Sequence, residues 1–338
     1  MLKSPKRKKS SIIKFKLYFI LLDQRSGSTL LASLLSKWMN TFVAPETNFP
    51  IQILINFPRG HVLTNEDCTK ISQILADDRK INDWGITDEL KVIVQAALGK
   101  TPEVLVDEIY TEYVNSLKLD DTLIIGFKKE SYMMVVDRLK ELYPTSKFIC
   151  MLRDPRGIFQ SKKTSVNTAI GKMFDKNVTR SALTWNQYVR SVNCVISTFP
   201  GDVLIVKYED LINSEELTMQ SVVDFLGLKI EKHEGNYTLH ERYAVSHGNI
   251  GKPPIKGNDR KWKRKLSATE ICLIEWVCKH DMREQGYTLV SQAYTRSMPR
   301  IIWGMLYTVY FKFAAYIKRR YGRFKYHPNG CFVVSKRH

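Results

Sequence analysis

The stretch "FILLDQRSGSTLLASLL", residues 19–35, decides the fold because it joins an apolar run, a turn of small residues and an apolar helical pattern. Leu30, Leu31, Leu34 and Leu35 recur at helical spacing, which predicts a helix over about 28–39 that follows a buried strand over 14–22. A helix that begins after a small-residue turn presents free backbone N–H groups and the positive end of its dipole. The stretch therefore predicts a phosphate-binding loop, although a plain strand–helix turn is the alternative.

This loop lacks the lysine of nucleotide-triphosphate loops. When Gly27-Ser28-Thr29 is aligned on the G-K-[ST] ending, Ser28 takes the place of the lysine and Leu22 that of the first glycine. That lysine serves the β- and γ-phosphates of a triphosphate. Here Arg25 precedes the turn, and Ser26, Ser28 and Thr29 add hydroxyl donors. We expect a ligand with one phosphate at its 5′ end.

Composition indicates a globular protein with anionic partners. The 338 residues are 44% hydrophobic and 25% charged, which argues against disorder and against a multi-span membrane protein. With 52 Lys+Arg against 34 Asp+Glu, the net charge is +18. This charge suits nucleic acid, a multiply phosphorylated nucleotide, an acidic glycan or an acidic lipid surface, and it does not choose among them. No zinc spacing, helix-turn-helix or RNP-like aromatic pattern is evident, so no nucleic-acid partner is expected.

Three further apolar runs predict central strands, namely "DDTLIIGFK", "SKFICMLRDP" and "GDVLIVKYEDL". Because such runs alternate with helical stretches, we predict a three-layer α/β/α fold with a mostly parallel central sheet. The expected organisation is a basic N-terminal tail over 1–13, one domain over 14–292 and an apolar, basic helical extension over 293–338.

A second stretch carries phosphate chemistry. "FICMLRDPRGIFQS" places Arg153 at the end of a strand, Pro155 in the turn, and Ser161 about two helical turns later. An arginine at a strand end and a helix hydroxyl can converge on one phosphate, because the guanidinium group supplies paired donors. Taken alone, the pattern is better explained by a surface Arg153–Asp154 turn that Pro155 stabilises.

Together the two stretches resemble the sulfotransferases that use 3′-phosphoadenosine 5′-phosphosulfate (PAPS). The resemblance implies a P-loop-NTPase-like sulfotransferase fold and a metal-free reaction whose nucleotide product is 3′-phosphoadenosine 5′-phosphate (PAP). It also implies that Arg153 and Ser161 hold the 3′-phosphate. The loop that it places around the 5′-phosphosulfate comprises Arg25, Ser26, Gly27, Ser28 and Thr29.

A third stretch, "IKGNDRKWKRKLS" at residues 255–267, keeps the register of the family's nucleotide clamp. The resemblance implies that Lys256 and Gly257 contact the 3′-phosphate. The stretch departs from the family pattern because Ile255 replaces an arginine and Arg260-Lys261 replace Gly-Asp. The alternative is a basic loop ahead of a helix that a capping box begins.

Sulfuryl transfer needs a base for the acceptor hydroxyl and a cation near the leaving oxygen. By resemblance, Glu46 in "VAPETNF" is the predicted base and Lys128 in "IIGFKKE" is the predicted cation. Glu130 is the alternative base and Lys129 the alternative cation. The histidines form no ligand cluster, so no metal is expected. Asp210 and Glu275 resemble structural positions of the family.

The resulting hypothesis is a PAPS-dependent O-sulfotransferase, and the C-terminal pattern, similar to carbohydrate sulfotransferases, favours a glycan or glycolipid acceptor. A nucleotide kinase or P-loop NTPase and a basic membrane-surface binding protein are the alternatives. The segment 299–320 is apolar with flanking arginines and lysines, which suits either a helix in an anionic membrane interface or a helix packed on the core or in a dimer. Six cysteines without C-x-x-C spacing favour a reducing compartment, so we expect a cytoplasmic protein with peripheral membrane association.

Overall fold

The computed structural model describes residues 16–39, 41–78, 80–117, 124–167, 172–174, 176–231, 255–290 and 306. The N-terminal tail 1–13 lies outside these residues, as does the predicted membrane segment 299–320 apart from Leu306. Among the described residues, no helix has the length and apolar content that crossing a bilayer requires.

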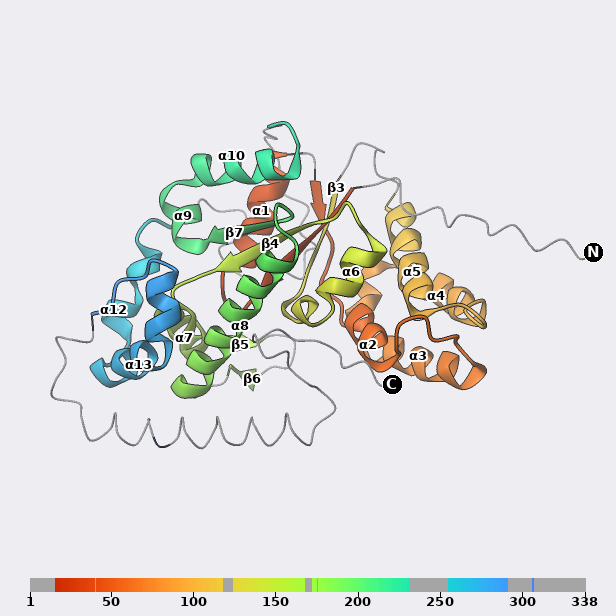
Figure 1. Cartoon of the computed structure of the whole chain (residues 1–338), viewed down its shortest axis with the longest axis horizontal. Coiled ribbons are helices and arrows are strands. Elements are labelled where there is room, and N and C mark those ends of the chain that lie inside the picture. Colours follow the sequence, from red (N-terminus) through yellow and green to blue (C-terminus); the bar gives the residue numbers. More distant parts are fainter. Residues whose placement is uncertain are drawn as a thin grey trace, which may run out of the picture.

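A parallel sheet forms the centre of the molecule, as the apolar runs predict (Figure 1). The described strands pair in the order β2-β3-β1-β4-β7. Their bounds are β1 Leu17–Leu22, β2 Thr41–Val43, β3 Ile124–Lys128, β4 Lys147–Leu152 and β7 Val203–Lys207. A separate antiparallel pair joins β5 Val166–Asn167 to β6 Lys172–Met173. Since every pairing in the main sheet is parallel, the carboxyl ends of its strands share one edge.

Helices cover both faces of the sheet, which confirms the predicted three-layer α/β/α class (Figure 1). One face packs against α1 Ser28–Trp38, α9 Tyr208–Asn213 and α10 Glu215–Leu226. The other packs against α2 Phe49–Asn56, α3 Asn65–Asp77, α4 Thr87–Gln95, α5 Pro102–Ser116, α6 Val136–Leu142, α7 Pro155–Thr164, α8 Val178–Thr198, α12 Trp262–Lys265 and α13 Ala268–Glu284. Short 3₁₀ segments complete the order: η1 Ile81–Trp84, η2 Glu130–Met134 and η3 Asn258–Arg260.

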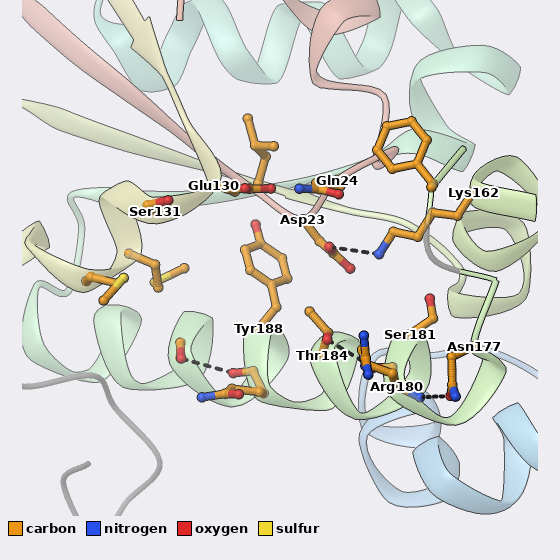
Figure 2. A pocket seen from close by; sticks show the side chains of 16 residues that line it. Asp23, Gln24, Glu130, Ser131, Lys162, Asn177, Arg180, Ser181, Thr184 and Tyr188 are labelled. Carbon is orange, nitrogen blue, oxygen red and sulfur yellow. Dashed lines mark hydrogen bonds and ion pairs between the residues drawn. The ribbon is translucent and has the colours of Figure 1, made fainter. Parts of the chain in front are cut away.

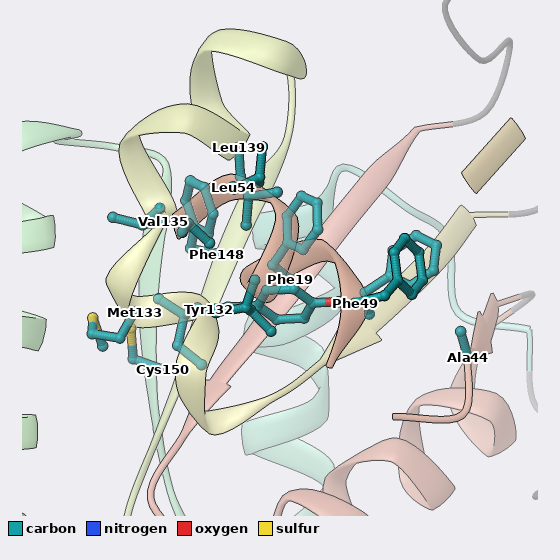
Figure 3. Packing of buried hydrophobic residues seen from close by; sticks show 14 of the residues in the cluster. Phe19, Ala44, Phe49, Leu54, Tyr132, Met133, Val135, Leu139, Phe148 and Cys150 are labelled. Carbon is teal, nitrogen blue, oxygen red and sulfur yellow. The ribbon is translucent and has the colours of Figure 1, made fainter. Parts of the chain in front are cut away.

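Strand β1 distributes its side chains between the two layers. Phe19 belongs to the core beneath α2–α8, whereas Tyr18 and Ile20 belong to the core beneath α1, α9 and α10. This alternation follows from the two-residue period of a strand. In Figure 3 Phe19 lies among aromatic rings, and its ring centroid is 5.4 Å from that of Tyr132 and 5.8 Å from that of Phe148. The fully buried β1 therefore anchors the loop that follows it.

One cysteine differs from the prediction of a reducing compartment, in which all thiols would be free. Cys68, Cys150 and Cys278 carry free thiols, whereas Cys194 on α8 is disulfide-bonded. Disulfides are rare in reducing compartments. Cys194 therefore departs from the predicted reducing compartment, whereas the three free thiols agree with it.

Candidate active site

The phosphate loop lies where β1 meets α1, as predicted. Gly27 is the N-cap of α1 with a φ of +98°, and Arg25 has a φ of +70°. A Cβ atom on Gly27 would lie 2.4 Å from Cδ2 of Tyr208, the first residue of α9. Glycine is therefore required here both by the backbone conformation and by the tyrosine ring packed against the loop.

The loop has polar groups that suit an anion. Gly27 supplies no side-chain cap for α1, and the first turn of α1 contains no acidic residue. Ser26 is fully buried, and its Oγ has no hydrogen-bond partner among the described residues; the same holds for Nε of Arg153. Buried polar groups are normally paired, and the N-terminus of a helix favours negative charge. These features fit a bound phosphate.

Two guanidinium groups meet beside this loop. Arg25 donates from Nε to Oγ of Ser161 at 3.0 Å and from Nη2 to Oγ of Ser165 at 3.2 Å. Arg153 donates from Nη1 to the backbone oxygen of Arg25 at 2.9 Å. Burial and the neighbouring charge of Arg153 both lower the pKa of Arg25. The structure thus brings the predicted residues Arg25, Arg153 and Ser161 together, and an anion between the two cations would relieve their repulsion.

Tyr208 connects the loop to the segment after residue 255. The guanidinium carbon of Arg153 lies 3.9 Å from the centroid of the Tyr208 ring, and Asn258 Nδ2 donates to the Tyr208 hydroxyl at 2.6 Å. Lys256 and Gly257 precede Asn258; both are exposed, and Gly257 is the N-cap of η3 with a φ of +77°. Tyr208 was not among the predicted site residues, although it stands in the stretch "GDVLIVKYEDL".

The two predicted catalytic side chains are in direct contact. Lys128 ends β3 and Glu46 follows β2, and these strands are parallel neighbours in the sheet. Nζ of Lys128 lies 2.5 Å from Oε1 of Glu46, while Nζ of Lys80 and of Lys129 lie 3.5 Å and 3.8 Å from Oε2. Burial favours the neutral acid, but the three lysines outweigh it and hold the pKa of Glu46 at about 2.

Glu130, the alternative base, has the opposite electrostatics. Burial raises its pKa, and the charge of Lys129 and a hydrogen bond with Gln24 offset this only in part. Glu130 and Gln24 line a cavity of ≈ 380 Å³ beside the loop, and their side chains lie close together in Figure 2. Lys162 and Asp23 line the same cavity and form an ion pair of 3.3 Å (Figure 2).

Glu275 has a structural place, as the sequence analysis interpreted it. Arg156 Nη1 donates to Oε1 of Glu275 at 2.5 Å, and its Nη2 donates to Oδ2 of Asp154 at 2.6 Å. The Arg156 guanidinium carbon also lies 3.9 Å from the centroid of the Trp262 ring. This buried cluster ties α7 to α12 and α13, and it fixes the turn that carries Arg153.

A family model decides the classification. The model for the sulfotransferase family matches residues 19–232, which include the phosphate loop, Glu46, Lys128 and Arg153. The chain belongs to the sulfotransferase family.

Relatives and solved structures of sulfotransferases agree with this. Carbohydrate sulfotransferase 1 of Danio rerio is 28% identical over 163 residues, which are 43% of this chain and 39% of that protein. A putative protein-tyrosine sulfotransferase of Caenorhabditis briggsae is 36% identical over 98 residues, which are 27% of this chain and 32% of that protein. The chain therefore spans well under half the length of these curated relatives.

The fold is similar to two solved sulfotransferase domains. The domain from the curacin biosynthetic pathway has a TM-score of 0.54 at 17% identity, with 82% of this chain and 99% of that one covered. The domain from the Synechococcus PCC 7002 olefin synthase has a TM-score of 0.50 at 19% identity, with 77% and 91% covered. At this identity the likeness supports the sulfotransferase fold.

The lysines around Glu46 predict a pH-dependent contribution to stability. The pKa of Glu46 in the folded protein, about 2, lies below its ordinary value of 4.5, so ionised Glu46 stabilises the fold. This stabilisation is fully present above pH 4.5 and is lost as the pH falls toward 2. This difference in pKa corresponds to about 3 kcal/mol in the free energy of unfolding. We expect Glu46→Gln to be less stable than the wild type at pH 7 and to approach it near pH 2. Urea unfolding at pH 7, 4 and 2.5 would measure this, and a constant difference across that range would contradict it.

Proposed function

We propose that this sulfotransferase transfers the sulfuryl group of PAPS to a hydroxyl of a glycan or glycolipid. The observation that carries the proposal is the lysine-free loop, in which the buried Ser26 hydroxyl has no hydrogen-bond partner within the described part of the chain and lies beside two adjacent guanidinium groups. Such a site provides for phosphate groups without the lysine that a γ-phosphate needs. The match to carbohydrate sulfotransferase 1 supports the glycan class of acceptor.

The loop and two other segments bind different phosphates of the nucleotide. We assign the 5′-phosphate side to Arg25, Ser26, Gly27, Ser28 and Thr29, where the first N–H groups of α1 and the hydroxyls can donate. We assign the 3′-phosphate to Arg153 and Ser161, with Lys256 and the N–H of Gly257 approaching from the segment that Asn258 ties to Tyr208.

The side chains beyond the loop supply proton and charge transfer. When bound, PAPS offers a sulfuryl group attached to a phosphate that leaves as PAP. The acceptor hydroxyl gives its proton to a carboxylate while its oxygen bonds to sulfur, and the bond from sulfur to the phosphate oxygen breaks with its electron pair on that oxygen. The Lys128 ammonium neutralises the charge that develops there. None of these steps needs a metal ion.

The proton acceptor in this proposal is Glu130, the alternative base of the sequence analysis. A general base works best when its pKa lies near the operating pH. Burial raises the pKa of Glu130, whereas Lys128, Lys80 and Lys129 overcome burial at Glu46 and hold its pKa at about 2. Glu46 then acts by positioning Lys128 at the leaving oxygen.

Ligand-induced stabilisation tests the donor. A ligand that binds only the native state stabilises it by RT ln(1 + [L]/Kd), which is about 2.7 kcal/mol at a hundredfold excess over Kd. We expect PAP to raise the melting temperature, and we expect Arg153→Ala to weaken PAP binding by roughly 10- to 100-fold because charge-assisted hydrogen bonds are lost. Thermal-shift titrations of both proteins would measure this.

ATP with magnesium and AMP are the controls, since neither carries a 3′-phosphate. Stabilisation by PAP alone, together with transfer of labelled sulfate from PAPS, supports the proposal. Equal stabilisation by ATP with magnesium would overturn the donor assignment and favour a nucleotide kinase or NTPase. PAP binding that Arg153→Ala leaves unchanged would overturn the assignment of Arg153 to the 3′-phosphate.

A further inference from the structure

The cavity beside the phosphate loop has walls of two chemical kinds. One wall consists of the end of β1, the two residues after it and η2. It combines the apolar side chains of Leu22, Met133 and Met134 with the polar side chains of Asp23, Gln24, Glu130 and Ser131, and Phe174 adds an aromatic ring. The other wall is a face of α8, which runs along the opposite side of the cavity in Figure 2. The cavity thus offers one ligand a wall of mixed apolar and polar side chains and, opposite it, a wall of polar side chains.

The polar wall is a row of hydrogen-bonding side chains at helical spacing. From the N-cap onward, its members are Asn177, Arg180, Ser181, Thr184, Gln187, Tyr188 and Ser191. At a rise of about 1.5 Å per residue, the row extends for about 21 Å. This is longer than a single sugar ring, so the row can serve a chain of rings.

Two lining residues carry buried polar atoms that lack partners among the described residues. Nε2 of Gln187 is a donor, and Oδ2 of Asp23 is an acceptor. A hydroxyl group can both donate and accept a hydrogen bond, so a ligand rich in hydroxyls satisfies either atom. A purely apolar ligand would leave both unpaired.

Charge in the cavity is balanced although the chain carries +18. The ionisable acids and bases of its lining are Asp23 and Glu130 against Lys162 and Arg180, and Asp23 pairs with Lys162 at 3.3 Å. A polyanionic ligand therefore gains little here from the overall positive charge, and a neutral ligand fits better.

We infer that this cavity binds the acceptor, and that the acceptor is a neutral glycan of more than one sugar ring. The inference rests on the proposed sulfotransferase function. The C–H faces of the rings lie against the methionines and Phe174, while the hydroxyls bond to the α8 row. Glu130 and Gln24 place the reacting hydroxyl next to the phosphate loop, since Gln24 directly precedes Arg25.

The experiment measures acceptor binding separately from donor binding. The full chain, saturated with PAP, is titrated calorimetrically with neutral tri- and tetrasaccharides of hexose and N-acetylhexosamine units. A tyrosine-containing acidic peptide and a polysulfated oligosaccharide are titrated in parallel. The variants are Thr184→Ala/Gln187→Ala, which removes two hydrogen-bonding groups, and Thr184→Trp, which fills the cavity from an exposed position. Ser197→Ala is the matched control, because Ser197 is exposed on α8 and lies away from the cavity lining.

We expect the double variant to bind the oligosaccharides at least tenfold more weakly and Thr184→Trp to show no measurable binding. Ser197→Ala should bind them like the wild type. The affinity for PAP should be equal in the wild type and the three variants. Oligosaccharide binding that Thr184→Trp leaves intact would remove the cavity from the acceptor site. If the wild type binds the peptide or the polysulfated oligosaccharide but not the neutral oligosaccharides, the neutral-glycan assignment is overturned and the sulfotransferase proposal stands. Failure of the wild type to bind PAP would overturn both.

Discussion

Glu130→Gln is expected to lower kcat for sulfuryl transfer by about 10²- to 10⁴-fold, the usual contribution of a positioned general base. The amide keeps the size of the side chain and its hydrogen bond with Gln24 but cannot take the acceptor proton. The Kd for PAP should stay within about twofold of the wild type, since Glu130 lines the proposed acceptor cavity and is not among the residues assigned to the nucleotide. Labelled sulfate transfer at saturating PAPS, with PAP binding as a second readout, would measure both quantities.

The pH profile separates a base from a structural carboxylate. Because the base must be ionised, wild-type kcat should rise with pH through the raised pKa of Glu130, and Glu130→Gln should lose this rise. Glu46→Gln is the matched comparison. It removes the negative charge from the 2.5 Å ion pair with Lys128 and so weakens the hold on the ammonium group. We therefore expect a loss of roughly tenfold, with the rise of kcat with pH retained. If Glu46→Gln loses more activity than Glu130→Gln and also loses the pH rise, Glu46 is the base and the assignment is reversed.

The fold could be predicted from the sequence because its signals are local. The apolar run before Asp23 predicts a strand, and the spacing of the leucines after Gly27 predicts a helix; each pattern spans only a few residues. The structure places β1 at Leu17–Leu22 and α1 at Ser28–Trp38. The three later apolar runs became β3, β4 and β7. Strand β2 escaped prediction because three residues, Thr41–Val43, are too few for an alternating pattern to be recognised.

The site was predictable only as separate pieces. Glu46 and Lys128 are 82 positions apart, and their contact depends on the pairing of β2 with β3, which no local pattern specifies. Tyr208 was missed because an aromatic residue at the end of an apolar strand indicates core packing, and its place over Gly27 arises only when α9 folds against α1. Similarly, the polar row on α8 has the pattern of a solvent-facing surface until η2 and the end of β1 lie opposite it.

The second large effect is expected at Gly27, where replacement by alanine should weaken PAP binding by about 100-fold or more. The φ of +98° is strained for any side chain, and the new Cβ would lie 2.4 Å from the Tyr208 ring. Either the ring or the loop must move. A shift of about 1 Å in a reacting or binding group can cost about 100-fold, and here the ring also supports Arg153 at 3.9 Å. Calorimetric titration with PAP would measure the loss.

Gly60→Ala separates the steric effect from backbone strain. Gly60 also has a positive φ, of +64°, but no atom lies within 4 Å of an added Cβ. Its replacement should cost about 1–2 kcal/mol of stability through the backbone alone and leave PAP binding unchanged. Gly27→Ala should cost a further ~1–3 kcal/mol, the usual range for overpacking, and also lose the ligand. If both variants bind PAP like the wild type, the tight approach of Tyr208 to the loop has no part in donor binding. If both lose it, the cause is general destabilisation, and the steric argument for Gly27 fails.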